Sequence, residues 1–135
     1  MTDLIEVKTA DLAGEPLNWS VAIAMGLNPS VVPAQYGVPA RVFIQQEGMF
    51  PERYKPCVDW AQGGPLIEKH HIQTSFNGKG FRTTSGEYWC AYVCSDTGKE
   101  QFPSGGGGTP LIAACRAIVA AKFVDSVQMP KELQP

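Results

Sequence analysis

One predicted helix near the C-terminus constrains the fold more than any other feature of the sequence. Residues 111–123 place their large apolar side chains at helical spacing, so that one apolar stripe runs along the helix: Leu111, Ile112, Cys115, Ile118, Val119 and Phe123. Thr109 suits the N-cap and Pro110 the first helical position. A helix of this kind must bury its stripe against another layer, so the rest of the chain has to supply one.

Several short segments can form that layer. Residues 4–7, 41–46, 72–76 and 88–94 have the composition of strands, and residues 127–130 are extended. Asn77-Gly78 favours a hairpin turn that would pair residues 81–84 with the strand before it. A further helix is expected over residues 16–26. The pattern predicts an α+β fold in which a small antiparallel sheet of about three to five strands packs against two or three helices.

Long segments rich in proline and glycine separate these elements. They cover residues 28–39, 49–65 and 96–110, and within the second of them Pro65 is expected to start a short helix over residues 66–71. Long ordered loops in a compact domain are usually functional. We therefore expect the functional site in these three segments.

Length and charge limit the classes of protein that remain. The chain has 135 residues, which predicts a single domain over residues 1–135, and its 13 acidic and 11 basic residues give a formal net charge of −2. This charge disfavours non-specific binding to nucleic acid. The sequence has no apolar run long enough to span a bilayer, and Asp3 and Glu6 stand where a signal peptide would be cationic or apolar. A soluble intracellular protein without membrane partners is expected.

The cysteines and histidines favour neither disulfides nor a metal. Cys90 and Cys94 lie on one predicted strand, about 13 Å apart, too far for a disulfide. A zinc site would combine Cys57, His70 or His71, Cys90 and Cys94, but no pair of these has the close spacing on a turn that marks a structural zinc site. We expect four thiols, no metal and no cofactor.

Glycine-rich segments before helices offer a place for an anion. Backbone N–H groups at such a terminus can bind phosphate or carboxylate, and the best candidate is the segment that holds Gly106, Gly107, Gly108 and Thr109. Gly63 and Gly64 precede the second predicted helix. The alternative is a flexible glycine tract with Thr109 as a simple N-cap.

Two tryptophans are candidates for stacking on a flat ring of a ligand. Trp60 stands beside Asp59 and Gln62, so its indole could stack on a flat ring while Asp59 or Gln62 binds the ring edge. Trp19 is a second candidate. The alternative for Trp60 is a core anchor. Arg116 either faces solvent or points beneath the glycine-rich segment.

Catalytic motifs are sparse. The nucleophile elbow and the zinc-protease motif are absent, and the acidic residues Asp59, Glu68 and Glu87 have no spacing that marks a catalytic pair. His70 or His71 could serve as acid or base, because histidine titrates near neutral pH. The sequence favours binding over catalysis and leaves an enzyme open.

Four segments of the chain resemble the NinX-like phage proteins. They are Leu17–Ala22, Asp59–Glu68, Thr109–Arg116 and Met129–Leu133, of which Asp59–Glu68 is the most specific. Two positions depart from the family pattern: Asn18 stands where an aspartate is expected, and residues 124–127 replace a Gly-Asp followed by an acid. The resemblance implies a small phage accessory protein and places Trp60 near two glycine-rich helix starts.

These features together predict a binding protein. The ligand would be an anionic nucleotide-type molecule, such as a cyclic dinucleotide or cyclic ADP-ribose-like immune signal of the host, sequestered without turnover by a homo-oligomer. One alternative is an enzyme that degrades such a nucleotide. Another is a protein-interaction module that acts through the proline-rich arm of residues 28–39.

Overall fold

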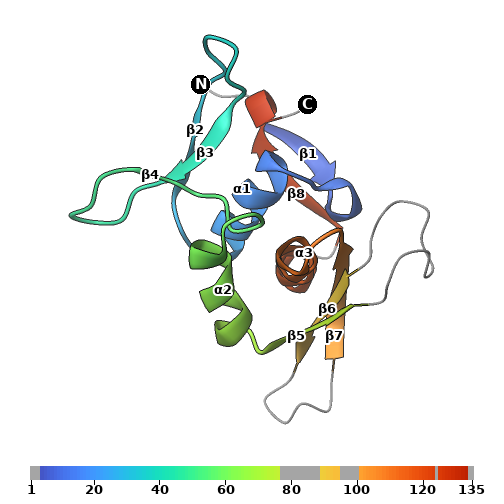
Figure 1. Ribbon diagram of the computed structural model, residues 1–135. Helices are drawn as coiled ribbons and strands as arrows, with labels where there is room; N and C mark the ends of the chain where they lie inside the picture. The colour runs from blue at the N-terminus through green and yellow to red at the C-terminus, as the bar shows by residue number, and fades with distance from the viewer. Residues whose placement is uncertain (1–3, 77–88, 95–100, 124, 134–135) are drawn as a thin grey trace.

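The computed structural model describes residues 4–76, 89–94, 101–123 and 125–133, which form helices and small antiparallel sheets (Figure 1). The predicted α+β class is confirmed. The helices are α1 (Glu15–Ala24), α2 (Trp60–Lys69) and α3 (Pro110–Lys122), with 3-10 turns at Thr9–Asp11 and Lys131–Leu133. The strands are β1 (Leu4–Lys8), β2 (Pro29–Val32), β3 (Arg41–Ile44), β4 (Glu52–Arg53), β5 (Ile72–Phe76), β6 (Trp89–Cys94), β7 (Gln101–Gly107) and β8 (Ser126–Pro130).

Helix α3 lies at the centre of the molecule, as its apolar stripe predicts. It is seen end-on in Figure 1, with α1 and α2 on one side and β5–β6–β7 on the other. Thr109 caps it by accepting a hydrogen bond from the Ile112 N–H at 3.1 Å, and Pro110 occupies its first turn. Because α3 contacts partners on several sides, its buried surface is wider than one stripe and includes Ala113, Ala114 and Ala117.

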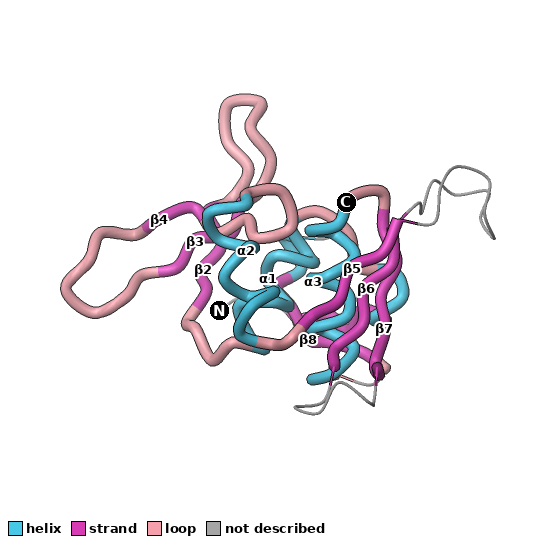
Figure 2. The backbone as a smooth tube through the Cα atoms, turned by 60° about the horizontal axis from the view of Figure 1, so that its bottom comes forward, coloured by secondary structure: helices cyan, strands magenta, loops and turns pink. Residues whose placement is uncertain are grey.

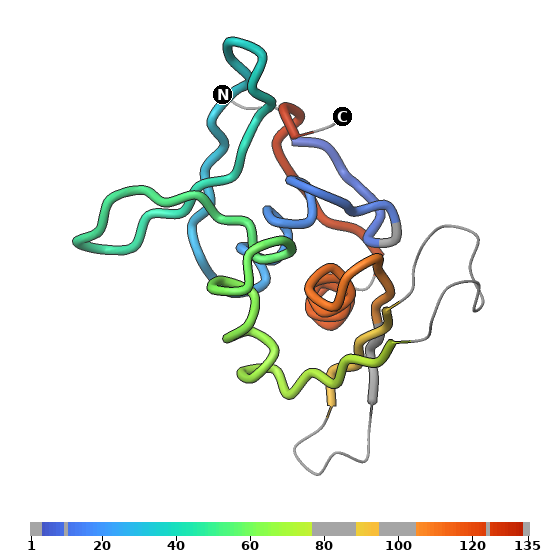
Figure 3. The backbone as a smooth tube through the Cα atoms, viewed as in Figure 1, coloured from blue at the N-terminus to red at the C-terminus, as the bar shows by residue number. Residues whose placement is uncertain are grey.

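The described strands form three separate sheets, where the sequence suggested one. Their orders are β1-β8, β2-β3-β4 and β5-β6-β7, and all pairings are antiparallel. Figure 2 shows the helices between the β2–β3–β4 and β5–β6–β7 sheets, and Figure 3 shows the first and last strands side by side. The expected Asn77-Gly78 turn and the strand at residues 81–84 lie outside the described residues.

The glycine-rich segment before α3 is a strand, which corrects the expectation of a loop. β7 runs through Gly107 and pairs with β6, with Gly105 opposite Ala91 and Gly107 opposite Trp89. A Cβ at Gly105 would lie 2.5 Å from the Ala117 nitrogen, and one at Gly107 would lie 2.6 Å from an Ile112 methyl carbon. Glycine is needed here because the strand lies directly against α3.

Helix α2 begins earlier than predicted. The expected helix covered residues 66–71 with Pro65 at its start, but α2 begins at Trp60 and contains Pro65. Pro65 is the sixth residue of α2, so it has no N–H to donate to the carbonyl of Ala61, and the helix lacks one hydrogen bond at this place. Asp59 supplies the N-cap by accepting a hydrogen bond from the Ala61 N–H at 2.9 Å.

The proline-rich segment 28–39 is only partly irregular. Residues 29–32 form β2, which pairs with β3, so the expectation of a loop throughout is wrong. The remainder is a tight arm, residues 33–39, closed by two hydrogen bonds between Gln35 and Val38. Tyr36 and Gly37 both have positive φ, 52° and 79°, as a type I′ two-residue turn requires.

Candidate functional site

Most of the predicted site residues lie in two groups, one at the start of α2 and one at the junction of β7 and α3. The first group contains Asp59, Trp60, Gln62, Gly63 and Gly64, and the second contains Gly106, Gly107, Gly108, Thr109 and Arg116. The groups meet where Gly63 approaches Leu111 in the first turn of α3. Ligand binding by these residues stays a prediction.

The indole of Trp60 is on the surface. It is 58% exposed, so the alternative of a core anchor is wrong. A Cβ at Gly64 would lie 3.8 Å from the indole Cε3 atom, which places the ring close to Gly64, one turn further along α2. Glycine leaves the ring free to lie against the helix. Stacking on an exposed indole at a defined place is therefore possible.

The side chain of Gln62 is hydrogen-bonded to the backbone of the preceding segment. Its side-chain oxygen accepts a hydrogen bond from the Lys55 N–H at 2.7 Å, and its amide nitrogen donates to the Arg53 carbonyl at 2.6 Å. These two bonds fasten α2 to the backbone that precedes it. Gly63 completes this junction, because a Cβ there would lie 2.3 Å from the Pro56 carbonyl oxygen and 2.7 Å from Leu111.

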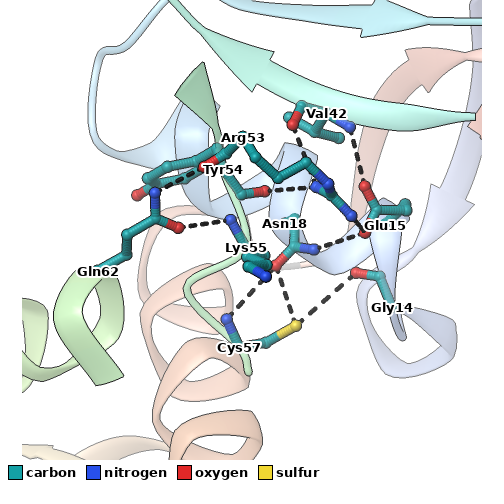
Figure 4. Close-up of polar contacts among 9 residues, drawn as sticks. All are labelled: Gly14, Glu15, Asn18, Val42, Arg53, Tyr54, Lys55, Cys57 and Gln62. Carbon is teal, nitrogen blue, oxygen red and sulfur yellow. Dashed lines mark hydrogen bonds and ion pairs between the residues drawn. The ribbon is translucent and has the colours of Figure 1, made fainter. Parts of the chain in front are cut away.

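A polar network lies beneath this junction and joins α1 to the β2–β3–β4 sheet (Figure 4). Glu15 accepts hydrogen bonds from the Val42 N–H at 2.8 Å and from Asn18 at 2.9 Å, and forms an ion pair with Arg53 at 2.6 Å. Arg53 also donates to the Val42 and Tyr54 carbonyls. A charged group with this many partners holds three chain segments in a single arrangement.

Asn18 is the most buried member of the network, with 1% of its surface exposed. Its amide nitrogen faces Glu15, and its amide oxygen accepts hydrogen bonds from the Cys57 thiol at 2.9 Å and from the Cys57 N–H at 3.4 Å. An amide can donate to a carboxylate on one side and accept from an N–H on the other, whereas an ionised carboxylate can only accept. Asn18, where the sequence analysis expected an aspartate, thus supplies both the donor and the acceptor of this arrangement.

The network residues Glu15, Asn18, Arg53 and Cys57 were not predicted as a group. Two signals could have pointed to them. Three predicted helices are preceded by a Gly-x-Pro motif, and only the motif Gly14-Glu15-Pro16 contains a carboxylate. Arg53 stands in a segment of aromatic and cationic residues. Neither signal shows that the two side chains meet. They are brought together by the packing of α1 against β3.

Arg116 points beneath the glycine-rich strand. Its guanidinium donates to the Gly106 carbonyl at 2.7 Å and its Nε to the Leu12 carbonyl at 3.3 Å. The solvent-facing alternative is thus wrong, and the side chain connects α3 to β7 and to the segment before α1.

The N-terminal ends of α2 and α3 leave fewer backbone N–H groups for an anion than the sequence suggested. At α2 the Ala61 N–H is bound by the Asp59 carboxylate, and at α3 the Ile112 N–H is bound by the Thr109 hydroxyl. Pro110 has no N–H to offer. A carboxylate at an N-cap also uses the favourable end of the helix dipole, so a ligand phosphate at α2 would meet a negative charge.

Trp19 lies apart from both groups. Its indole N–H donates to the Gln128 carbonyl of β8 at 3.2 Å, and its ring packs against the core formed by α1, β3, β8 and α3. The indole is half-buried. These contacts give Trp19 a role in attaching α1 to β8.

Two cysteine thiols in the core are held protonated. Burial and, to a smaller degree, the Glu15 carboxylate raise the pKa of Cys57 from 9.0 to about 11. Burial also raises the pKa of Cys115, with a smaller contribution from Cys57. All four cysteines are free thiols, as expected. Nucleophilic chemistry needs the thiolate, so neither Cys57 nor Cys115 is suited to it.

We expect Cys57 to resist alkylation by iodoacetamide in the folded protein at pH 8. A thiol whose pKa is about 11 has roughly 100-fold less thiolate at this pH than one with a pKa of 9.0, and burial slows access further. Labelling followed by peptide mass spectrometry, with and without urea, checks this result. Fast labelling of Cys57 without urea would contradict it.

The histidines lie at the C-terminal end of α2. His70 is half-buried, with its Nε2 atom 3.1 Å from the Met25 sulfur, and burial followed by the neighbouring Lys69 and His71 lowers its pKa. His71 is exposed and has a positive φ of 53°. The lowered pKa favours the neutral form of the His70 imidazole, which packs against the Met25 side chain.

Two further features concern metal binding and membrane insertion. Among residues 4–76, 89–94, 101–123 and 125–133, no group of three or more histidine, cysteine or acidic side chains is arranged to hold a metal ion. No helix in the described part of the chain is long and apolar enough to cross a membrane.

Comparison with known proteins agrees with the sequence motifs. The family described as Bacteriophage P22, NinX matches residues 8–122, which include Asn18, Trp60 and all three helices. No curated protein matches the chain. Because the match covers most of the 135 residues, the chain belongs to the NinX family of phage proteins.

Proposed function

We propose that this protein is a phage accessory factor that binds and sequesters a nucleotide-type molecule without transforming it. The observation that carries the proposal is Trp60, an exposed indole on an ordered helix next to Asp59. A flat indole face stacks on a nucleobase, and the Asp59 carboxylate lies close in the chain to bind polar groups of the ring.

The surroundings of Trp60 support binding at a defined position. Gln62 and Gly63 attach the start of α2 to the segment 53–56, and the network of Glu15, Arg53 and Asn18 attaches that segment to α1. A stacking ring on a fixed support loses little conformational entropy when a ligand binds.

The phosphate-binding part of the site has to come from groups other than the capped helix ends. Lys55 is the cation closest to Trp60 in the chain, and its backbone is bound by Gln62. We propose this lysine as the partner of the ligand's negative charge. Candidate ligands are cyclic dinucleotides and cyclic ADP-ribose isomers that act as host immune signals, which would make the protein an anti-defence factor.

Sequestration fits the chemistry of the described residues better than turnover. The thiols of Cys57 and Cys115 are buried with raised pKa values, and His70 contacts Met25. The enzyme alternative would need other groups, of which His71 is exposed. Mass spectrometry of the nucleotide after incubation separates the two, since a sponge releases its ligand intact.

We expect one nucleotide from a panel of cyclic dinucleotides and cyclic ADP-ribose isomers to raise the melting temperature of the wild-type protein. The same nucleotide should not change the melting temperature of Trp60→Ala. A ligand at about 100 times its dissociation constant adds ~2.7 kcal/mol to the free energy of unfolding. Without ligand, Trp60→Ala should melt within about 2 °C of the wild type, because the indole is mostly exposed. Differential scanning fluorimetry measures both quantities.

A matched control distinguishes stacking from a general effect of the helix. Lys69→Ala changes an exposed residue at the other end of α2 and should keep the full ligand shift. An unchanged melting temperature across the whole panel would contradict the proposal, and so would an equal shift in Trp60→Ala.

One observation favours the protein-interaction alternative. Tyr36, at the tip of the 33–39 arm, is 100% exposed and adopts a positive φ that is costly for a residue with a side chain. Asparagine or glycine is the usual choice in such a turn. A large aromatic side chain kept there is consistent with a contact surface, and a negative nucleotide panel would favour this second function.

A further inference from the structure

A second arm, residues 45–52, presents the other exposed aromatic of the β2–β3–β4 sheet. It connects β3 to β4, and we refer to it as the Phe50 arm. Phe50 is 92% exposed and Met49 beside it is 62% exposed. Figures 1 and 3 show the Phe50 arm extending away from the helices, on a different side of the sheet from the arm of residues 33–39.

The Phe50 arm has an ordered turn. The Met49 N–H donates to the Gln46 carbonyl at 2.9 Å, and Gly48 has a φ of 77°, as the third position of a type II turn requires. The Gln45 amide also donates to the Met49 carbonyl at 3.2 Å. These bonds fix the backbone of Met49, and the exposed side chain of Phe50 follows directly after it.

The base of the arm is anchored in the core. Ile44 pairs with Glu52 and is 3% exposed, while Arg53 follows directly and forms the ion pair with Glu15. An apolar pair that stays mostly exposed on an anchored turn gains little from folding, since most of its surface remains in water. Such a pair can gain the free energy of burial only from another molecule.

The charge of the arm defines the class of that molecule. Its ionisable side chains are Glu47 and Glu52, and it contains no lysine or arginine. Without these two carboxylates the 13 acidic and 11 basic residues of the chain would balance, so the net negative charge of the protein is equal to the charge of this arm. Carboxylates beside an apolar anchor repel phosphates and anionic lipid headgroups, which disfavours nucleic acid and membrane surfaces.

We infer that the Phe50 arm is a docking element for a protein that has an apolar cleft rimmed by lysine or arginine. Phe50 and Met49 would fill the cleft, and Glu47 and Glu52 would face the basic rim. The inference goes beyond the proposed nucleotide binding and does not depend on it, because it uses none of the residues near Trp60.

The first step of the test identifies the partner. The full chain is made in infected bacterial cells with the photo-crosslinking residue benzoylphenylalanine in place of Phe50. The control carries the same replacement at Phe76, which is 59% exposed on β5. We expect an adduct with one protein from position 50 and none with that protein from position 76.

The second step measures binding with that protein in purified form. Phe50→Ala should weaken the affinity by about 30-fold or more, which is typical of a central aromatic anchor. The double variant Glu47→Lys, Glu52→Lys should weaken it by roughly tenfold or more and reduce its dependence on salt. Phe76→Ala should change it by less than about twofold.

Two further measurements separate a loss of docking from unfolding and from a loss of nucleotide binding. Because Phe50 is almost fully exposed, Phe50→Ala should melt within about 1 °C of the wild type, so lost binding cannot be ascribed to unfolding. The increase in melting temperature with nucleotide should be the same for Phe50→Ala and the wild type. If no nucleotide raised the melting temperature of the wild type, the docking of the Phe50 arm would still be tested by the crosslinking and affinity measurements.

Several outcomes would overturn the inference. They are an adduct with a second copy of this chain, no adduct from position 50, an adduct from position 76 alone, and a charge reversal that leaves the affinity unchanged or strengthens it.

Discussion

An Asn18→Asp variant is expected to be about 3 kcal/mol less stable than the wild type at pH 7. The new carboxylate would replace the amide that donates to Glu15 at 2.9 Å, so two negative charges would face each other at a site with 1% exposure. Arg53 already pairs with Glu15 and can compensate only in part. We expect a decrease in melting temperature of roughly 10 °C, measured by circular dichroism.

The loss of stability caused by Asn18→Asp should become smaller as the pH falls. Burial and the neighbouring Glu15 raise the pKa of the introduced aspartate above its unfolded value, so the folded state binds its proton more tightly than the unfolded state does. The stability difference from wild type is therefore largest at neutral pH and shrinks as pH falls through the raised pKa. In the protonated form the carboxyl group can donate to Glu15 and restore the lost hydrogen bond.

The control is Asn28→Asp, which makes the same chemical change at an exposed position. It should alter the free energy of unfolding by no more than about 0.5 kcal/mol at any pH between 5 and 8. Equal stability of Asn18→Asp and wild type at pH 7 would show that the network does not hold α1 to the sheet as described.

A Gly63→Ala variant is expected to lose about 3 kcal/mol of stability. The added methyl group would lie 2.3 Å from the Pro56 carbonyl oxygen, which is backbone and cannot rotate away, and 2.7 Å from Leu111. Relief requires α2 to move away from α3 and from the segment before it. Urea denaturation measures the loss, and the position of Trp60 should change with it.

Gly64→Ala is the matched control, one residue further along the same helix. Its Cβ would lie 3.8 Å from the Trp60 ring, an ordinary contact distance. Alanine favours helix over glycine, but a Cβ before Pro65 is disfavoured in helical backbone, so the two effects oppose each other. We expect stability within about 1 kcal/mol of wild type. Similar losses for both variants would contradict the close approach at Gly63.

The elements that follow from local pattern agree with the sequence analysis. The stripe of residues 111–123 predicted α3, Pro16 and Gly26 bracketed α1, and the strand segments 72–76 and 88–94 correspond to β5 and β6. Each depends on interactions between residues close in the chain, which periodicity and capping describe well. The strands at residues 29–32 and 101–107 were missed because proline and glycine usually mark loops.

The error at β7 has a clear physical cause. In β7 the glycines serve close packing, since Gly105 and Gly107 allow α3 to approach the strand, and this need is set by a partner elsewhere in the chain. The same holds for Gly63 against Pro56. A glycine selected for space and one selected for flexibility are identical in sequence, and only the neighbouring element distinguishes them.

By itself, the sequence determined the α+β class, the central helix, the free thiols and the resemblance that the family match confirms. Only the tertiary structure decided that Trp60 is exposed, that Arg116 binds the Gly106 carbonyl, and that Glu15, Asn18 and Arg53 form one network. Helix and strand formation depend on near neighbours along the chain. Exposure and polar pairing depend on which distant segments pack together, and one sequence does not specify those contacts residue by residue.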